Sequence, residues 1–243
     1  MSRLLVFDSL DSTNDYLKRE ATKLPEGTVV LANQQTGGKG RLGRKFFSPP
    51  SMGIYMSMLL KPDCAPLDAA TLTANIAAAV CKAIERHCPY SPDIKWINDI
   101  YLRGKKICGI LCESSITDHK LDYVVAGVGL NVITRPDDFP PELFKTAGSI
   151  YSQTGLVPDR GQLIMAMIEE LDAMYAAWKD NPSVYLEEYR HRCSMLGKEV
   201  EIYNSDGSFN VVAEAISPDF GLVVRYKNGE KKTLHAGEVS IKL

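Results

Sequence analysis

The sequence lacks an excess of charge of either sign. Its 243 residues contain 28 Lys and Arg against 30 Asp and Glu, which gives a formal net charge of -2. This balance provides no global field that would attract nucleic acid or an anionic membrane, although a local basic segment can still bind phosphate. We therefore expect no nucleic-acid partner.

Long apolar runs are also missing. No apolar run approaches the ~20 residues that span a bilayer, and Arg3 and Asp8 come too early for a secretory signal peptide. Hydrophobic residues make up 45% and charged residues 24%, which excludes a collagen-like or mainly disordered chain. The expectation is a cytoplasmic globular protein with no membrane partner.

Metal and disulfide patterns are absent. The chain has no CxxC pair and no HExxH segment, and its four histidines are scattered. Six cysteines are far below the density of a secreted disulfide scaffold, so we interpret them as reduced core thiols. No protein-bound metal site is predicted. The cysteines are Cys64, Cys81, Cys88, Cys108, Cys112 and Cys193.

What is present divides the chain near residue 195. Before it, apolar patterns predict strands at 3–7, 28–32, 53–60, 94–96 continuing into 101–102, 106–113 and 121–132, with helices at 16–18, 67–88, 160–178 and 183–193. After residue 197, short strands at 200–203, 211–216, 222–226 and 239–243 are separated by turns such as Asp206-Gly207. We expect a domain over 1–194 and a small β-barrel domain over 195–243.

The segment 37–45 is a glycine-rich basic loop. Its glycines let the backbone approach a ligand closely, and its cations suit a nucleotide phosphate. The spacing is neither a Walker loop nor a dinucleotide-binding GxGxxG. Two other interpretations remain open: a flexible solvated loop, or a DNA-contacting arm, which the acidic total charge disfavours.

Several motifs, taken in order, resemble the biotin protein ligases. They are Ser12-Thr13-Asn14, Gln34, the basic loop, Lys95-Trp96-Ile97-Asn98-Asp99, the segment 104–113, Gly127-Val128-Gly129-Leu130-Asn131 and Gly237-Glu238-Val239-Ser240. Each motif alone is weak, but their common order is specific. The resemblance implies an α+β fold whose mixed central sheet is flanked by helices, of the class II synthetase and biotin ligase type. It also implies a C-terminal SH3-like β-barrel.

The resemblance implies an enzyme that activates biotin with MgATP to biotinyl-5′-AMP. Biotin is then transferred to one lysine of a carrier protein, such as the biotin carboxyl carrier subunit of acetyl-CoA carboxylase. On this basis the catalytic residues are Lys106, Arg41 and Asp99. The biotin site comprises Ser12, Thr13, Asn14, Gln34, Gly38, Gly40, Arg41, Lys106, Gly109, Leu111 and Gly127. The ATP site comprises Lys39, Arg41, Arg44, Phe46, Lys106 and Asn131.

Four positions depart from the family pattern. Lys39 stands where an arginine is usual, Leu42 replaces a basic residue, and Phe46 replaces the tryptophan against which adenine packs. Ile97 also replaces a proline, which changes the backbone preference before Asn98.

The proposed chemistry fits these residue types. Attack of a carboxylate on the α-phosphate of ATP builds negative charge, which Mg²⁺, Arg41, Arg44 and Lys106 can stabilise without a protein nucleophile. In the second step, Asp99 is the candidate for orienting the carrier ammonium and accepting its proton.

Simpler interpretations remain for the same residues. Ser12 and Thr13 suit a helix N-cap, Asp99 suits a turn and Lys106 suits an exposed hairpin. A lipoate–protein ligase is the alternative enzyme, and a biotin sensor without catalysis is the alternative binding protein. The early position of Ser12 leaves no room for a winged-helix domain, so operator binding is not expected. The resemblance also makes a homodimer plausible, through edge strands of the central sheet.

Overall fold

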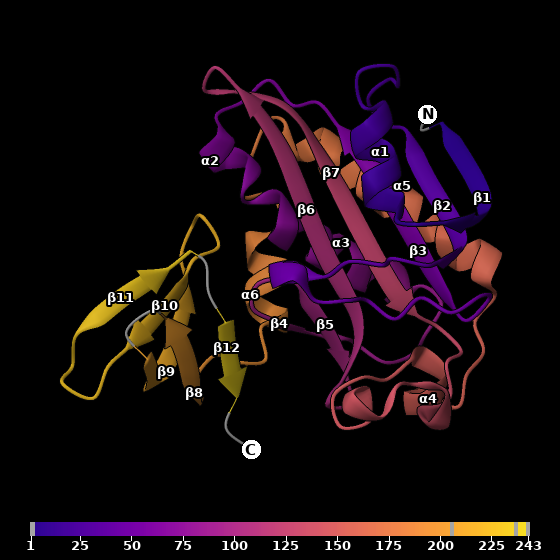
Figure 1. Cartoon of the computed structure of the whole chain (residues 1–243). Coiled ribbons are helices and arrows are strands. Elements are labelled where there is room, and N and C mark those ends of the chain that lie inside the picture. The colour runs from indigo at the N-terminus through magenta and orange to yellow at the C-terminus, as the bar shows by residue number, and fades with distance from the viewer. Residues whose placement is uncertain (1–2, 205–206, 236–237, 242–243) are drawn as a thin grey trace.

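A mixed seven-stranded sheet forms the centre of the protein (Figure 1). The computed structural model describes residues 3–204, 207–235 and 238–241. The strand order is β1-β2-β3-β7-β6-β5-β4; β1 and β2 are parallel, and every other neighbouring pair is antiparallel. The strands are β1 (Leu4–Leu10), β2 (Val29–Gln35), β3 (Gly53–Leu60), β4 (Asp93–Lys95), β5 (Asp99–Leu102), β6 (Lys105–Thr117) and β7 (Lys120–Asn131). The predicted mixed central sheet is confirmed.

The stretch from 94 to 102 forms two strands where the sequence predicted one. Lys95 pairs with Asp99 in the antiparallel register of β4 and β5, so the chain reverses direction at Trp96, Ile97 and Asn98. This reversal places Asp99 at the start of β5, beside Gly109 of β6.

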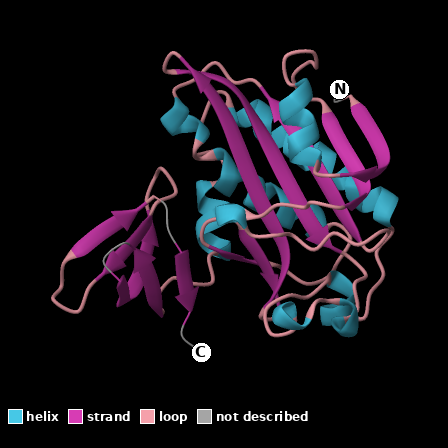
Figure 2. Cartoon of the chain, in the orientation of Figure 1, coloured by secondary structure: helices cyan, strands magenta, loops and turns pink. Residues whose placement is uncertain are grey.

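The sheet is covered on both faces. Along β2, Val30 belongs to one hydrophobic cluster, whereas its neighbours Val29 and Leu31 belong to another. Because successive side chains of a strand point to opposite faces, the two clusters lie on opposite sides of the sheet. The smaller cluster contains Leu17 of α1 (Thr13–Glu20). The larger contains α3 (Leu72–Glu85) and α5 (Arg160–Trp178), which lie behind the sheet in Figure 2.

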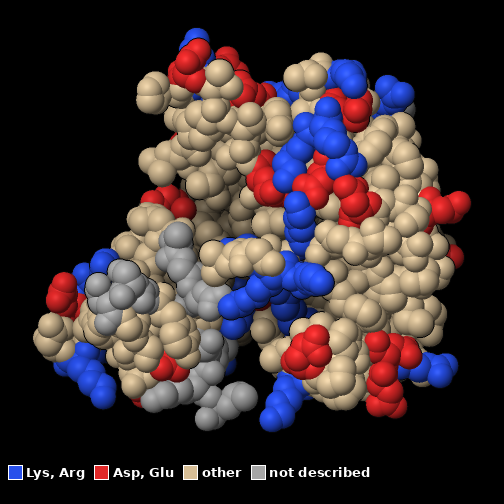
Figure 3. All heavy atoms as spheres, in the orientation of Figure 1, with Lys and Arg blue, Asp and Glu red and all other residues tan. Residues whose placement is uncertain are grey.

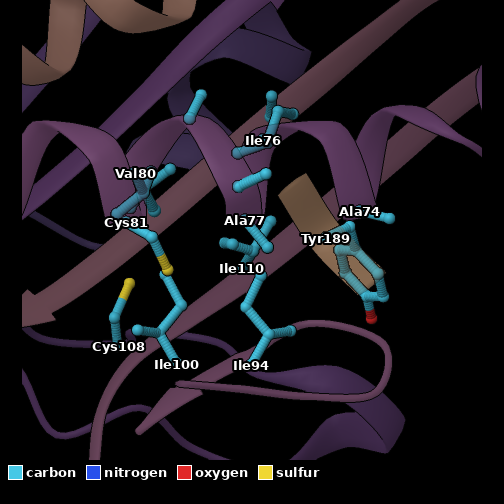
Figure 4. Close-up of a cluster of buried hydrophobic side chains, with 14 of the residues drawn as sticks. Ala74, Ile76, Ala77, Val80, Cys81, Ile94, Ile100, Cys108, Ile110 and Tyr189 are labelled. Carbon is cyan, nitrogen blue, oxygen red and sulfur yellow. The ribbon is translucent and has the colours of Figure 1, made fainter. Parts of the chain in front are cut away.

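The larger cluster is built mainly from α3. Ala77 and Cys81 point toward side chains of β4, β5 and β6 (Figure 4). Because α3 is rich in alanine, it can lie close to the strands beneath it. Cys81 and Cys108 are among these buried side chains, and all six cysteines are free. The interpretation of these two thiols as core residues is thus confirmed.

One helical stretch changes an expectation from the sequence. Residues 66–85, comprising α2 (Pro66–Ala69) and α3, are long and apolar enough to cross a membrane, with a mean hydropathy of 1.3. No such run was expected from the sequence. Of an apolar 18-residue segment within this stretch, 72% is buried inside the protein, which is typical of a core helix.

The proline-rich segment after β7 is irregular. It contains two single-turn 3₁₀ helices, Pro136–Asp138 and Pro141–Leu143, and the short helix α4 (Ile150–Thr154). The final helix of this region, α6 (Leu186–Arg192), is shorter than the predicted 183–193.

The C-terminal part is a five-stranded antiparallel sheet in the order β11-β10-β9-β8-β12. It comprises β8 (Glu199–Asn204), β9 (Gly207–Ile216), β10 (Leu222–Arg225), β11 (Lys231–Leu234) and β12 (Glu238–Ile241). Strand β11 was not expected from the sequence, because its Lys-Lys-Thr-Leu segment is polar. No pairing joins β11 to β12 within the described residues. Parts of three predicted features lie outside the described residues: Asp206 of a turn, Gly237 of a motif and Leu243 of the last strand.

The C-terminal sheet is fixed to the β4 end of the central sheet. Trp96 donates a hydrogen bond from Nε1 to the carbonyl of Phe220 at 2.8 Å. Arg190 of α6 donates to the carbonyl of Ile216 at 2.7 Å. Buried residues of both sheets belong to one hydrophobic cluster. This packing places Val239 of β12 at the rim of the cavity described next.

Candidate active site

A cavity of about 350 Å³ lies where the glycine-rich loop crosses the face of β6 and β7. Most residues assigned to the ligand site line it. They are Ser12, Thr13, Asn14, Lys39, Gly40, Arg41, Arg44, Phe46, Asp99, Lys106, Gly109, Leu111, Gly127 and Asn131. Residues up to 119 positions apart, from Ser12 to Asn131, thus meet at one place.

Two assigned residues do not line the cavity. Gln34 is replaced there by Gln35, whose Oε1 accepts a hydrogen bond from the backbone N–H of Thr13 at 2.8 Å. Neighbouring residues of a strand face opposite sides, so a shift of one position exchanges the two glutamines. Gly38 lies behind the cavity, where a Cβ would come within 2.5 Å of the Phe46 carbonyl oxygen. Its role in the structure is close packing of the loop.

The floor of the cavity is made from glycines of β6 and β7. Gly109 pairs with Gly129, and Leu111 pairs with Gly127. A Cβ at Gly127 would lie 2.2 Å from Asn14 Oδ1, and one at Gly129 would lie 2.6 Å from the Phe46 ring. Side chains larger than hydrogen are therefore excluded where Asn14 and Phe46 approach the sheet. Gly129 belongs to the motif at 127–131, but it was not among the site residues assigned from the sequence.

The strand spacing orders the cavity along β7. Gly127, Gly129 and Asn131 are alternate residues, so they face the same side at intervals of about 6.8 Å. Asn14 lies over the first and Phe46 over the second. The polar residues of α1 and Asn131 thus mark two ends of a site about 13 Å long.

The loop is folded over this site as a narrow hairpin. The N–H of Phe46 donates to the carbonyl of Gly38 at 2.9 Å, and the N–H of Gly40 donates to that of Arg44 at 2.7 Å. At its tip Leu42 and Gly43 adopt left-handed φ angles of 57° and 73°. The glycine conformation was expected, but Leu42 in this region carries backbone strain.

Side-chain contacts of Lys39 and Arg41 tie the loop to the rest of the protein. Lys39 Nζ lies 2.7 Å from Asp15 Oδ2, and Arg41 donates to Asn98 Oδ1 at 3.0 Å. Burial opposes ionisation of Asp15, but hydrogen bonds from Lys18 and Lys39 prevail and lower its pKa below 3.8. Asp15 is therefore ionised at neutral pH and can hold Lys39.

Basic side chains gather in the middle of this face of the molecule (Figure 3). Beneath the loop, Lys106 Nζ lies 2.6 Å from Asp99 Oδ1, and both side chains are largely buried, with exposures of 32% and 21%. The two residues thus form an ion pair inside the cavity, unlike an exposed hairpin cation and a turn carboxylate. Such a site favours an anion that can replace Asp99 as the partner of Lys106.

Asn131 has an acceptor without a partner. Its side chain is 5% exposed and its Nδ2 donates to the Gly148 carbonyl at 3.0 Å. Its Oδ1 is buried and has no hydrogen-bond partner in the described structure. An unpaired buried acceptor is costly, so a ligand N–H or O–H at this end would be stabilised.

Hydrogen bonds fix the N-terminus of α1. Ser12 caps the helix by accepting from the N–H of Asp15, which confirms the predicted capping function. Asn14 Nδ2 donates to Glu113 Oε2 at 2.8 Å, and Ser57 lies 2.6 Å from Asn14 Oδ1. Glu113 and Ser57 were not predicted as site residues. Only their contact with α1 across 99 and 43 positions of sequence reveals them.

The described residues contain no cluster of three or more His, Cys, Asp or Glu side chains able to hold a metal. A metal acting here would thus take its ligands mainly from phosphate oxygens and water, as Mg²⁺ commonly does.

Comparisons with known proteins show the family of the chain. Residues 6–131 match the family model described as biotin/lipoate A/B protein ligase. The chain is 32% identical to a bifunctional ligase/repressor BirA of Bacillus subtilis, covering 96% of this chain and 72% of that protein. It is 30% identical to a biotin--[acetyl-CoA-carboxylase] ligase of Mycobacterium tuberculosis, covering 94% and 85%.

A solved structure extends the likeness to the entire chain. The biotin protein ligase of Aquifex aeolicus in complex with biotin and ATP superposes with a TM-score of 0.84 and 27% identity, covering 100% of this chain and 99% of that one. With the relatives above, this establishes that the chain belongs to the biotin/lipoate A/B protein ligase family.

Proposed function

We propose that this protein is a biotin protein ligase, which forms biotinyl-5′-AMP from biotin and MgATP and transfers biotin to a carrier lysine. The observation that carries the proposal is one elongated cavity with a polar clamp at Asn14, an ion pair at its middle and an unpaired acceptor at Asn131. Such a cavity suits an acyl group and a nucleotide joined end to end. Relatives named as biotin–carboxylase ligases support this activity and a carboxylase carrier as partner.

In the first step, the residues supply position and positive charge. Lys106 would exchange Asp99 for the biotin carboxylate and the α-phosphate, while Arg41, Arg44 and Lys39 approach from the loop. Mg²⁺, when bound, would neutralise charge on the leaving pyrophosphate. The closed hairpin of the loop would exclude water from the mixed anhydride.

In the second step, the carrier amine would attack the acyl carbon of biotinyl-5′-AMP, and AMP would leave as the amide forms. Asp99, once Lys106 contacts phosphate, could accept a proton from the carrier ammonium, which is almost fully protonated at neutral pH. The structure supports this exchange because both groups share one position in the cavity.

Individual roles follow the position of each side chain. We assign the α1 end, with Ser12, Thr13, Asn14 and Gln35, to biotin. The end with Phe46 and Asn131 is assigned to the nucleotide. Gly40, Gly109 and Gly127 would contact biotin through their backbone, and Leu111 through its backbone or its apolar side chain. Gln35 takes the role first assigned to Gln34, and Gly38 acts through loop packing.

Further proposals concern the domain organisation, the C-terminal sheet and the assembly of the protein. We propose that residues 1–194 and 195–243 are separate domains, and that the C-terminal sheet is the family's SH3-like barrel. A homodimer would use β1, an edge strand whose Leu4 and Val6 are 40% and 63% exposed. The cytoplasmic location and the absence of a nucleic-acid partner stay predictions from the sequence.

Isotope exchange tests the first step alone. Labelled pyrophosphate should enter ATP when biotin is present, and lipoate should not substitute for biotin. Exchange with lipoate only would assign the alternative ligase. Biotin binding without any exchange would assign the sensor and contradict the proposed function.

A further inference from the structure

Behind the polar end of the cavity, Ser57 of β3 joins two residues of α1. Its side chain is fully buried, and its Oγ lies 2.6 Å from both Thr13 Oγ1 and Asn14 Oδ1. Ser57 does not line the cavity, whereas Thr13 and Asn14 do. On the neighbouring strand it pairs with Gly127, whose missing side chain leaves the space for Asn14. Any influence of Ser57 on a ligand must therefore pass through α1.

The orientation of the Asn14 amide is fixed by its partners. Its nitrogen faces the carbonyl of Leu111 at 3.1 Å and the carboxylate of Glu113 at 2.8 Å. Both partners accept hydrogen bonds and cannot donate them, so the nitrogen must point toward them. Lys18 also pairs with the Glu113 carboxylate, at 2.7 Å. The amide oxygen of Asn14 consequently points toward Ser57.

The single hydroxyl proton of Ser57 must then go to Asn14. An amide oxygen cannot donate, and two oxygens at 2.6 Å without a proton between them would repel each other. Ser57 therefore has no proton left for Thr13. Its 2.6 Å contact with Thr13 Oγ1 can be a hydrogen bond only if Thr13 is the donor.

This assignment also uses the only hydroxyl proton of Thr13. The alternative acceptor, Gln35 Oε1, is farther away at 3.1 Å and already accepts from the N–H of Thr13. The hydrogen-bond chain thus runs from Thr13 through Ser57 to Asn14. It leaves the lone pairs of Thr13 Oγ1 free for a donor from the ligand.

We propose that Ser57 is a positioning residue that makes Thr13 a hydrogen-bond acceptor and so selects a ligand ring that carries an N–H donor. The inference rests on the proposed function, and it concerns how the site recognises its acyl substrate. The cyclic urea of biotin has two N–H groups, whereas the dithiolane ring of lipoate has none. Selection between these two rings is therefore set by a residue that touches neither of them.

A cycle of substrate and enzyme changes tests this directly. Pyrophosphate exchange is measured for the wild type and Ser57→Ala, with biotin and with biotin methylated on one or the other ureido nitrogen. In the wild type, methylation of the nitrogen that faces Thr13 should raise KM about tenfold or more. In Ser57→Ala, that penalty should shrink to less than about threefold, because Thr13 is then free to donate elsewhere. The steric effect of the methyl group is the same in both enzymes and cancels.

The same variant should show a selective kinetic change. Ser57→Ala should raise KM for unmodified biotin about tenfold and change kcat by less than about twofold. Thr28→Val is the matched control: Thr28 directly precedes β2, is also fully buried, donates to the Pro25 carbonyl at 2.8 Å and does not line the cavity. Its KM for biotin should equal that of the wild type. If Ser57→Ala does not fold, Ser57→Cys, nearly equal in size and a weaker donor, should give an intermediate penalty.

The outcomes separate this inference from the proposed function. No exchange by the wild type with biotin would contradict the function itself. The other outcome is that the wild type exchanges pyrophosphate with biotin, but methylation of either ureido nitrogen raises KM by the same factor in the wild type and in the Ser57 variant. That result would overturn the role of Ser57 while leaving the function intact.

Discussion

Replacing Lys106 with alanine should separate catalysis from stability. Lys106 forms an ion pair with Asp99 inside the cavity, but a third of its side chain remains exposed. Loss of a pair with this exposure should lower the free energy of unfolding by about 1 kcal/mol or less. The fold should therefore survive the change.

The expected loss of rate is much larger. A cation about 4 Å from the charge that develops on phosphate contributes about 4 kcal/mol at an effective dielectric constant near 20. At about 1.36 kcal/mol for each tenfold change, Lys106→Ala should slow biotin adenylation about a thousandfold. This agrees with the effect of removing one preorganised donor from an anionic transition state.

Pyrophosphate exchange and urea unfolding measure the two quantities on the same preparation. Lys179→Ala is the matched control, because Lys179 pairs with Glu26 at 3.0 Å but does not line the cavity. The control should keep wild-type exchange. A pyrophosphate-exchange rate of Lys106→Ala within tenfold of the wild-type rate would refute the assigned role. A free energy of unfolding lowered by more than about 3 kcal/mol would show a structural role instead.

Three further changes probe the floor, the loop and α1. Gly129→Ala places a methyl group against the Phe46 ring, where a Cβ would lie at 2.6 Å, and should raise KM for ATP at least about fivefold without changing KM for biotin. Asp15→Asn weakens the contact with Lys39 and should speed dissociation of biotinyl-5′-AMP about two- to fivefold, as measured by release from a filter. Because the pKa of Asp15 is lowered, its carboxylate holds Lys39 at any pH above the ordinary value of 3.8, and this contact is lost only as the pH falls through the lowered pKa. In the wild type, retention of biotinyl-5′-AMP should therefore be constant between about pH 6 and pH 9. Leu17→Ala removes a fully buried side chain beneath α1 and should cost about 2–4 kcal/mol in urea unfolding while raising KM for biotin; an unchanged KM would show that α1 keeps its position without this packing.

Elements with one strong pattern could be predicted from the sequence. The strand Gly53–Leu60 and the helix Arg160–Trp178 have the predicted bounds. The strand is an apolar run that is buried along its full length, and the helix combines a regular apolar face with an Asp159 N-cap. In both cases local pattern and tertiary packing favour the same structure.

Elements whose form depends on distant partners were missed. The reversal between β4 and β5 depends on antiparallel pairing within a stretch that reads as one strand, and β11 is a polar strand held by β10. The exchange of Gln34 for Gln35 is a shift of one residue, which the sequence cannot fix without the position of α1. Ser57 is an ordinary strand serine until α1 is placed against it.

The residues of the cavity show the same distinction. Motif resemblance identified most of the residues that line the cavity, because their chemical types are distinctive: a cationic glycine loop, Lys106 and the Ser12-Thr13-Asn14 triplet. It could not show that Lys106 and Asp99 pair, or that Glu113 orients Asn14. The pairing of Lys106 with Asp99 depends on strand register. Asp99 lies opposite Gly109, and because Gly109 has no side chain, the side chain of Lys106 can lie over it.

Mass measurement of a carrier domain tests the central claim most directly. The protein is incubated with biotin, MgATP and the carrier domain of a biotin-dependent carboxylase, with the same mixture lacking ATP as control. The account predicts that the carrier gains the mass of one biotinyl group at a single lysine, only when ATP is present. An unmodified carrier, with the protein folded and the carrier competent for a known ligase, would contradict it.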